Sequence, residues 1–591
     1  MNFAERLAAV RAEMARQGLA AFLVPRSDEH LGEYVPASAE RLAWLTGFRG
    51  SAGLAAVFPD RAAVWSDGRY VLQLEAETDG ALWERLHLSK QVPAKVVVGW
   101  VAEGAGVGYD PWLFSEDQVR QYREAGLNMV AVDVNPVDVA WKERPGAPMD
   151  VASLHDARYA GETSEQKRGR VAARLRADRQ DAVVLSDPAS IAWLLNIRGN
   201  DIGFVPVALG FAVLHVDAGV ELFMHPQKLP QEVRDGLGNA VACAPREALD
   251  GALASLAGKR VRVDAANAPA WLGESLRREG AIVSAGQDPC LVLKARKNAV
   301  EQQGARGAQA RDAVAVCRFL HWVRDAAGHE TELSAAAQLL RFRQKCALFR
   351  GESFPAISAA GEHGAIIHYR VSLETDRAIL PNELYLIDSG AQYLDGTTDV
   401  TRTVWTGPSL PTAEQRDRYT RVLKGHIAIA TMVFPEGVAG VRLDAFARSA
   451  LWQVGLDFDH GTGHGVGSYL SVHEGPASIS PHLRAAPLEE GMIMSNEPGF
   501  YLPGEYGIRL ENLVLVQPAS MAVMPKFYRF ETLTWAPFDR LLIEPSLLSD
   551  TELDWLDRYH AEVLARVGPH VGLDVRDWLV QVCAPLKALV A

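Results

Sequence analysis

The chain has 591 residues, of which 48% are hydrophobic and 23% are charged. It is therefore too long for one hydrophobic core, and about three or four domains are expected. The composition is that of a folded, soluble protein and excludes disorder, a collagen-like repeat and a disulfide scaffold. A formal charge of −13 offers no basic surface for nucleic acid or an anionic membrane. The five scattered cysteines contain no CxxC motif, which indicates a reducing compartment and free, buried thiols.

The amino terminus is expected to belong to the mature fold. Apolar residues recur there at steps of four, three and four with charges between them, which predicts an amphipathic helix. They are Phe3, Leu7, Val10 and Met14. No uncharged apolar stretch reaches the roughly 18 residues that a membrane-spanning helix needs. We therefore expect a cytoplasmic protein, with neither membrane nor nucleic acid among its partners.

Two segments in the first half of the chain resemble each other. Each contains an amphipathic helix, a buried strand, an Ala-Trp-Leu and then an Arg-Gly, with the tryptophans at Trp44 and Trp193. We interpret this as a duplicated α/β domain, with copies over 1–157 and 158–297. The alternative is two unrelated α/β domains that share a helix-then-strand order.

The second half begins with a long helix, predicted from about Asn298, and changes after Glu383 to short strands and glycine turns. This part is expected to form a third domain over 298–545. The remaining segment, 546–591, is expected to be a helical extension, in which 549–569 has helical periodicity with Ser549 or Asp550 as the amino-terminal cap and Gly568-Pro569 as the stop. We see no chemistry in this carboxyl-terminal extension.

Two aspartates are candidate metal ligands. Asp388 follows an apolar run and is delivered from a buried strand, and Asp399 lies eleven residues later, after an Asp-Gly turn signal. Antiparallel strands joined by a short turn bring such residues onto neighbouring positions of one face. Two buried carboxylates that close would repel each other unless cations lay between them. For Asp388 alone, a strand-end cap is the alternative.

One histidine and two glutamates extend this set. His464 lies between glycines in GTGHGVG, where the backbone can approach closely, so we expect a ligand and not a core histidine. Glu497 ends another apolar strand, and Glu511 follows in GIRLENLVLV. Strand alternation places Arg509 on the same face as Glu511, so it is expected to keep Glu511 ionised or to pair with it. Without a metal, that pair would be an ordinary salt bridge.

One imidazole and four carboxylates form a hard, oxygen-rich ligand set. Such a set suits manganese, cobalt or zinc in a carboxylate-bridged pair and disfavours thiolate-seeking metals. Two metals about 3.5–4 Å apart can share a hydroxide and stabilise both sides of a hydrolytic transition state. A calcium site is the competing interpretation, and the imidazole disfavours it.

These five residues, in this order, resemble the ligand pattern of the metallopeptidase family with the pita-bread fold, which includes methionine aminopeptidase, prolidase and aminopeptidase P. The match is to the long, three-domain type of aminopeptidase P. It extends over nearly the whole chain through the strings WSDGRY, AWLLNIRGND, DHGTGHGVG and FETLTWAPFDRLLI. The resemblance implies an α/β (α+β) protein with two creatinase-type amino-terminal domains followed by a pita-bread metallopeptidase domain.

The resemblance also implies a role for each ligand. Asp388 would bind one metal, whereas Asp399 and Glu511 would bridge both. His464 and Glu497 would complete the second site, and Glu497 would also take the proton of the bridging hydroxide as general base. Two divalent ions per subunit are expected, Mn²⁺ first, with Co²⁺ and Zn²⁺ as alternatives.

Four further residues are assigned to the substrate by the same resemblance. His473 in SVHEGP resembles the histidine that hydrogen-bonds the scissile carbonyl as charge develops. His368 and His460 resemble those that shape the proline-side pocket and position the substrate, and Arg509 is placed with them. The expected catalytic residues are then Glu497, His368 and His473. Without the resemblance, each outer histidine would be interpreted as an ordinary core or surface residue.

The implied function is release of the first residue from peptides with proline in second position, by a homodimer. An Xaa-Pro bond has no N–H, so a site shaped to the proline ring is needed. Prolidase, which cleaves Xaa-Pro dipeptides, shares the ligands but normally has one amino-terminal domain. A non-catalytic peptide-binding module of the same fold is the other alternative, and the intact five-residue set argues against it.

Overall fold

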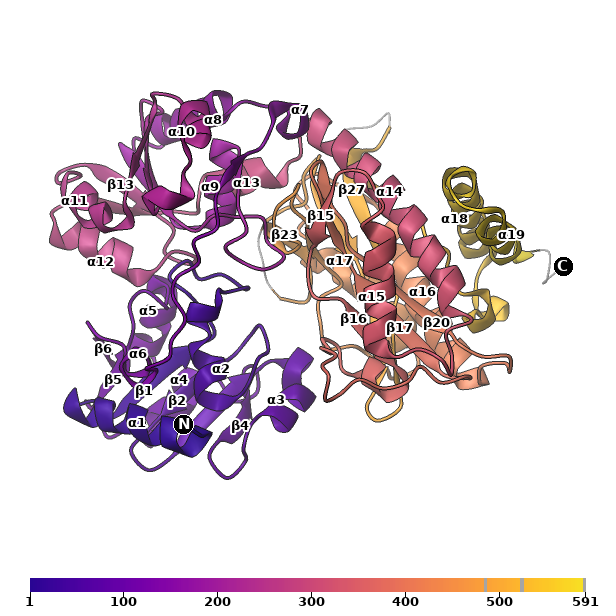
Figure 1. Cartoon of the computed structure of the whole chain (residues 1–591), viewed down its shortest axis with the longest axis horizontal. Helices are drawn as coiled ribbons and strands as arrows, with labels where there is room; N and C mark the ends of the chain where they lie inside the picture. The colour runs from indigo at the N-terminus through magenta and orange to yellow at the C-terminus, as the bar shows by residue number, and fades with distance from the viewer. Residues whose placement is uncertain (483–485, 521–525, 588–591) are drawn as a thin grey trace. The chain divides into compact units, whose positions relative to one another are not determined.

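The computed structural model forms two compact units (Figure 1) and describes residues 1–482, 486–520 and 526–587. The first unit consists of Met1–Ala157 and Glu162–Leu291, and the second of Arg158–Gly161 and Val292–Ala591. The short helices α7 (Ala157–Ala160) and α13 (Cys290–Ala295) lie where the chain passes between the units. Within the described part of the chain, none of the helices has both the length and the apolar character that crossing a bilayer requires.

The first unit contains two six-stranded sheets that share one topology. The first sheet has the order β4 (Glu84–His87), β3 (Ala62–Ser66), β2 (Leu54–Val57), β1 (Ala21–Pro25), β5 (Gly106–Tyr109), β6 (Asn128–Ala131). The second has the order β12 (Val241–Ala244), β11 (Val220–Phe223), β10 (Phe211–His215), β8 (Ala182–Leu185), β13 (Arg260–Val263), β14 (Ile282–Ala285). In both, the first strand along the chain is antiparallel to one neighbour and parallel to the other. Matching order and direction are what a duplication produces, so they favour it over two unrelated domains.

A helix precedes the first strand of each sheet. These helices are α1 (Phe3–Arg16) and α8 (Ser164–Ala177), each begun by a capping box. The predicted apolar face of α1 is buried at Leu7, Val10 and Met14 and packs in one cluster with residues of β1, β2 and β3. The remaining elements are α2 (Arg41–Thr46), α3 (Val71–Glu77), α4 (Pro93–Trp100), α5 (Glu116–Glu124), α6 (Pro136–Ala140), β7 (Ser153–Leu154), α9 (Pro188–Leu195), β9 (Ile197–Arg198), α10 (Gln231–Leu237), α11 (Leu249–Ala254) and α12 (Ala270–Arg278).

The second unit is built on several smaller sheets and one of six strands. The small sheets are β16 (Ile357–Ala360), β17 (Leu384–Ser389), β20 (Val400–Trp405); β15 (Phe349–Glu352), β18 (Ala391–Tyr393), β19 (Gly396–Thr397); and β25 (Gly499–Leu502), β26 (Tyr506–Arg509). The six-stranded sheet has the order β21 (Val433–Pro435), β28 (Phe527–Thr532), β27 (Asn512–Pro518), β24 (Ile493–Asn496), β22 (Gly463–Gly465), β23 (Glu474–Ile479). These antiparallel sheets carry all five predicted metal ligands at or beside strand ends.

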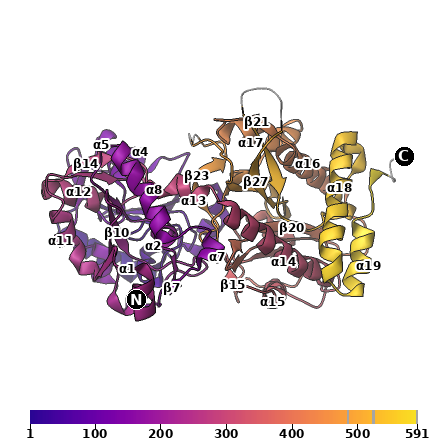
Figure 2. The same ribbon diagram turned by 90° about the horizontal axis from the view of Figure 1, so that it is seen from above.

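The helices of the second unit are α14 (Ala299–Val323), α15 (Glu332–Arg343), α16 (Ala413–Ala430), α17 (Val441–Trp452), α18 (Asp550–Val567) and α19 (Leu573–Val582). The helix predicted from about Asn298 is α14, and Asn298 caps it. The predicted tail helix is α18, capped by Ser549, and α19 follows it beyond the segment with predicted periodicity. Figure 2 shows α18 and α19 beside each other, and both pack against α14. Their buried residues belong to the same hydrophobic cluster as those of α14 and β17, so the tail is part of the core of this unit.

All five cysteines are free, as predicted. Cys290, Cys317 and Cys583 are buried, whereas Cys243 is exposed and Cys346 is half-buried. The expectation of buried thiols is therefore wrong for Cys243, which lies on the outer strand β12 of its sheet.

Candidate metal centre

Strand pairing brings the two aspartates together. β17 and β20 are antiparallel, with Asp388 opposite Thr401, and Asp399 immediately precedes β20. Between them the chain forms the β18–β19 hairpin, which pairs with β15. Tyr393 pairs with Gly396, so the predicted short turn is confirmed at Leu394–Asp395, and the neighbouring positions of the carboxylates follow from the antiparallel register.

Three residues from distant parts of the chain converge on one point. Asp399, His464 and Glu511 each offer a ligand atom, and these atoms lie within 4.8 Å of one another. His464 Nε2 is 3.5 Å from Asp399 Oδ2 and also 3.5 Å from Glu497 Oε1. The geometry therefore brings four of the five predicted ligands into one cluster that could hold a metal ion.

Glycines allow His464 to sit between packed strands. A Cβ at Gly463 would collide with the carbonyl oxygen of Ser495, and one at Gly465 with that of Glu474. β22 pairs with β23 and β24 at this point, so only glycine fits the close backbone approach. The alternating glycines of GTGHGVG thus serve the strand packing that presents the imidazole.

Asp388 is tied to the cluster by an arginine. Arg509, only 2% exposed, donates from Nη2 to Asp388 Oδ2 at 2.7 Å and from Nη1 to the Tyr501 hydroxyl at 2.7 Å. Among the described residues, Asp388 Oδ1 is buried and has no hydrogen-bond partner. A buried carboxylate oxygen without a donor is costly unless something positive binds it, so this atom fits a metal ligand.

The expected pairing of Arg509 with Glu511 is wrong, but the charge of Arg509 does lower the pKa of Glu511, against the larger effects of burial, Glu497 and Asp388. The stretch 506–518 is not one strand, because β26 ends at Arg509 and β27 begins at Asn512. The strand alternation on which that expectation rested is interrupted between them. Glu511 instead accepts a hydrogen bond from the Thr401 hydroxyl at 2.7 Å.

The carboxylates of this cluster repel one another. The pKa of Asp399 is raised well above its usual range by burial, and then by the charges of Glu511, Asp388 and Glu497. The pKa of Glu511 is raised in the same way, by burial and then by Glu497 and Asp388. Such a group of acids is stable in ionised form only with added positive charge, and the donor set of four carboxylates and one imidazole suits hard divalent ions.

The outer histidines lie in different surroundings. His460 Nε2 is 2.9 Å from the Tyr501 hydroxyl, which is also the partner of Arg509. The ring of His473 packs edge-on against His464, with centroids 4.3 Å apart. His368 is half-buried in the loop between η5 (Gly361–Ala365) and β17. His460 and His473 are thus connected to the cluster by contacts, and the segment of His368 follows η5, which packs on β26.

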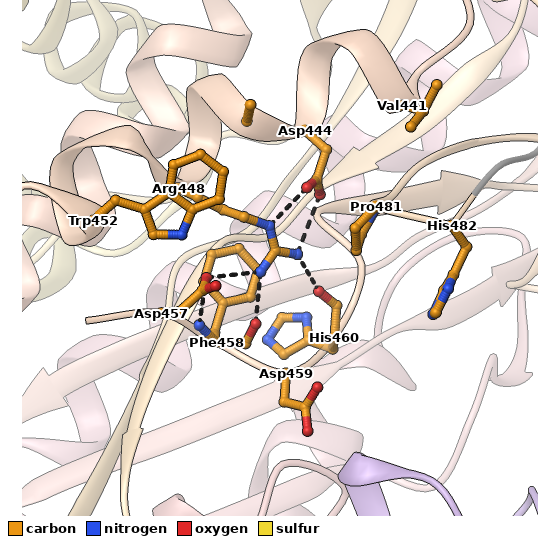
Figure 3. A pocket seen from close by; sticks show the side chains of 11 residues that line it. Val441, Asp444, Arg448, Trp452, Asp457, Phe458, Asp459, His460, Pro481 and His482 are labelled. Carbon is orange, nitrogen blue, oxygen red and sulfur yellow. Dashed lines mark hydrogen bonds and ion pairs between the residues drawn. The ribbon is translucent and has the colours of Figure 1, made fainter. Parts of the chain in front are cut away.

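A cavity of about 380 Å³ opens beside His460 (Figure 3). Arg448 lines it and donates hydrogen bonds to Asp444, Asp457 and the carbonyl oxygen of Phe458. Arg448 also donates to the carbonyl oxygen of His460, so it holds the loop that leads from α17 to the metal cluster.

Models of known families cover most of the chain. The metallopeptidase family M24 matches residues 303–518, and the C-terminal region of peptidase M24 matches residues 526–586. Creatinase/prolidase N-terminal domains match residues 6–140 and 143–301. Xaa-Pro aminopeptidase 2 from Sus scrofa is 37% identical over 100% of this chain and 90% of its own length. The chain belongs to metallopeptidase family M24.

Other M24 proteins show how much of the fold is shared. Aminopeptidase P2 from Arabidopsis thaliana is 38% identical over 98% of this chain and 88% of its own. The crystal structure of X-prolyl aminopeptidase from Caenorhabditis elegans, described as a cytosolic enzyme with a di-nuclear active site, has a TM-score of 0.93. It is 33% identical and covers 99% of this chain and 100% of its own. Together these matches confirm the predicted architecture of two creatinase-type domains followed by a pita-bread domain.

An Xaa-Pro dipeptidase from Bacillus anthracis has a similar fold over part of this chain. It is 20% identical with a TM-score of 0.53, and the match covers 64% of this chain and 99% of that one. At this identity only the fold is shown. The dipeptidase structure thus lacks a counterpart for about a third of this chain, as expected if one amino-terminal domain is extra.

Three residues of this M24 site were not identified from the sequence. Ser495 connects two ligands. Its hydroxyl accepts a hydrogen bond from the backbone N–H of His464 at 2.9 Å and donates one to Glu497 Oε1 at 3.1 Å. Thr401 donates a hydrogen bond to Glu511, and Tyr501 accepts one from Arg509. Ser495 and Thr401 each lie two residues from a predicted ligand, and this spacing on a strand was a usable signal. Nothing local marks Tyr501.

We expect the metal-free protein to lose stability as pH rises. The folded-state pKa values of Asp399 and Glu511 lie above the ordinary 3.8 and 4.5, so the folded state binds more protons than the unfolded state. The stability that these two groups contribute is then greatest below these ordinary values and falls as pH rises through the raised ones. Thermal midpoints of chelator-treated and Mn²⁺-loaded protein, measured from about pH 5 to about pH 8, should diverge as pH increases. A difference between the two midpoints that stays constant across this pH range would contradict the expected loss of stability.

Proposed function

We propose that this chain is an Xaa-Pro aminopeptidase that depends on two divalent metal ions. The observation that carries the proposal is the group of four carboxylates and one imidazole, buried at Asp388, Asp399 and Glu511, in which Asp388 Oδ1 has no partner among the described residues. Relatives similar over nearly their full length are named Xaa-Pro aminopeptidase, and the Caenorhabditis elegans enzyme is described as having a di-nuclear active site. We propose Mn²⁺ as the metal, with Co²⁺ and Zn²⁺ as alternatives.

The residues that would hold the two ions are Asp388, Asp399, His464, Glu497 and Glu511, and by the family resemblance Asp399 and Glu511 would serve both. When bound, such ions supply Lewis acidity and a nucleophile that is usable near neutral pH. Arg509 and Thr401 hold Asp388 and Glu511 in fixed directions through the hydrogen bonds described above.

Glu497 is proposed as the general base. Its Oε1 accepts a hydrogen bond from Ser495, which fixes the rotamer, and it lies 3.5 Å from His464. A carboxylate held at the edge of the cluster can take the proton of the attacking water and pass it to the leaving nitrogen.

His473, His368 and His460 are proposed to contact the substrate. His473, packed against His464, is suited to donate a hydrogen bond to the scissile carbonyl oxygen as negative charge develops. His368 and His460 would shape the site around the proline ring. For Arg509 a substrate contact is not favoured, because its guanidinium nitrogens bond Asp388, Tyr501 and Thr401.

The test is hydrolysis of an Xaa-Pro-Xaa tripeptide beside an Xaa-Pro dipeptide, with metal analysis of the same sample. We expect tripeptide turnover that is lost on chelation and restored by Mn²⁺, with about two ions per chain. Turnover of the dipeptide alone would assign a prolidase. Peptide binding without hydrolysis in the metal-loaded protein would assign a non-catalytic module.

We also propose a cytoplasmic homodimer with parts 1–157, 158–297, 298–545 and 546–591. The description of the Caenorhabditis elegans enzyme as cytosolic supports the location. Sedimentation of the purified protein tests the dimer, and a single species with the monomer mass would contradict it.

A further inference from the structure

A buried arginine connects the tail helix α18 to the backbone of the metal cluster. Arg402 on β20 is 1% exposed. Its Nη1 donates to the carbonyl oxygen of Glu511 at 2.6 Å, and its Nη2 to Asn512 Oδ1 at 2.8 Å. The same Nη2 is 3.0 Å from the hydroxyl of Tyr559 on α18. One side chain therefore touches the peptide unit of a proposed metal ligand and the carboxyl-terminal extension.

A buried histidine holds the other side of the same ligands. His426 on α16 is 0% exposed, and its Nδ1 lies 3.1 Å from the carbonyl oxygen of Asn496 and 3.2 Å from that of Leu510. These residues immediately precede Glu497 and Glu511. The Nδ1–H group thus bonds the chain just before each of two proposed ligands.

The protonation of this histidine is consistent with its partners. Burial, and then the charge of Arg402, lowers the pKa of His426 to about 3, so the ring is neutral at pH 7. With its proton on Nδ1, Nε2 accepts from Asn512 Nδ2 at 3.2 Å. That contact turns Asn512 Oδ1 toward Arg402, and the amide is bonded on both sides.

Tyr559 completes the chain of contacts. Its ring is 4% exposed and stacks on Trp555 and Trp535 at 5.3 and 5.7 Å. Its hydroxyl lies 2.9 Å from the carbonyl oxygen of Ala536 and accepts from the Ala536 N–H at 3.2 Å. The hydroxyl is therefore fixed by the segment that joins β28 to the tail and offers an oxygen to Arg402.

We propose that Tyr559, Arg402, Asn512 and His426 form a positioning network through which α18 holds Glu511 and Glu497 at the separation that two metal ions require. The inference rests on the proposed function for its ligand assignments. Its physical reason is the crowding of like charges: Asp399, Glu511 and His464 offer ligand atoms within 4.8 Å of one another, and carboxylates this close repel each other in the absence of metal. A backbone anchored on both sides of Glu511 resists that displacement, so less of the metal-binding free energy is spent on reordering the site.

The test compares two single hydroxyl deletions in the full chain. Tyr559→Phe removes the oxygen that faces Arg402. The control, Tyr419→Phe, removes a hydroxyl that is equally buried and accepts a hydrogen bond from the Asp539 N–H, without a bond to the network. Asn512→Ala removes the central amide.

Mn²⁺ titration calorimetry of the metal-free proteins is the first readout, at a temperature well below thermal unfolding. We expect Tyr559→Phe to weaken Mn²⁺ binding about three- to tenfold, and Asn512→Ala about 10- to 100-fold. Tyr419→Phe should leave the Kd within about twofold of wild type while losing a similar amount of thermal stability. The double variant of Tyr559 and Asn512 should bind no more weakly than Asn512→Ala alone, because both act in one network.

Two results would overturn the network. One is a lowered thermal midpoint in Tyr559→Phe with unchanged Mn²⁺ affinity, as in the control, which would make Tyr559 a stabilising core residue only. The other is additive losses in the double variant. If wild-type protein binds two Mn²⁺ ions but hydrolyses no Xaa-Pro-Xaa peptide, the proposed function fails, while the affinity comparison still decides the network.

Discussion

Replacing Glu497 with alanine is expected to lower kcat for an Xaa-Pro-Xaa tripeptide by at least about 10³-fold, because the change removes a general base and a metal ligand together. The fold should survive, since Glu497 contributes to the repulsion that raises the pKa of Asp399 and Glu511. Circular dichroism and thermal unfolding of the metal-free variant should therefore match wild type or show a slightly higher midpoint.

The matched control is Glu505→Gln, an exposed carboxylate on the turn between β25 and β26. It should retain wild-type kcat and metal content. Unchanged turnover in Glu497→Ala at saturating Mn²⁺ would refute the assigned mechanism. A loss of turnover accompanied by unfolding would leave the role to be decided with Glu497→Gln, which keeps the side-chain volume.

Glu474→Ala is expected to destabilise the second unit by about 3–5 kcal/mol, because it leaves two buried lysines without their counter-charge. Glu474 lies beside His473, and its side chain is 1% exposed. It pairs with Lys294 at 2.9 Å and with Lys297, both also buried. Removing one partner of such a group costs more than the group contributes when complete, because the remaining charges stay desolvated.

This ion group also predicts a response to acid. Burial tends to raise the pKa of Glu474, but Lys294 and Lys297 outweigh it, and the pKa lies below the ordinary 4.5. Its stabilisation is therefore complete above that value and is lost as pH falls through the lowered one. The variant should lose this part of the acid dependence. Glu490→Ala, which breaks an exposed pair with Lys526, is the control and should change the midpoint little. An equal loss of stability in Glu474→Ala and Glu490→Ala would contradict a special role for the buried ion group.

Much of the site was predictable because its residues occupy recognisable local positions. Asp388 and Glu497 follow apolar strand sequences, and His464 lies between glycines that only close strand packing requires. The repeated helix-and-strand order of the first half predicted two related domains, and the two sheets share one topology. Local periodicity was sufficient wherever one element determines the direction of one side chain.

What could not be predicted depends on contacts between distant segments. Arg509 pairs with Asp388, 121 residues away, and not with its near neighbour Glu511. Arg402 meets Tyr559 across 157 residues, so the tail helix was predicted without any link to the chemistry. Such partners follow from tertiary packing, which leaves no periodic signal in either segment.

The hairpin between the two aspartates has a consequence for engineering. A Cβ at Gly390 would collide with Ser353 and the backbone of Thr398, and one at Gly396 would press on Ala305 and Ala308 of α14. The β18–β19 connector is thus tightly packed at two points, at Gly390 against the segment that follows β15 and at Gly396 against α14. Its length is a fixed dimension of the protein, so adding or deleting even one residue there should shift one aspartate out of register, unlike the tolerance usual for hairpin loops.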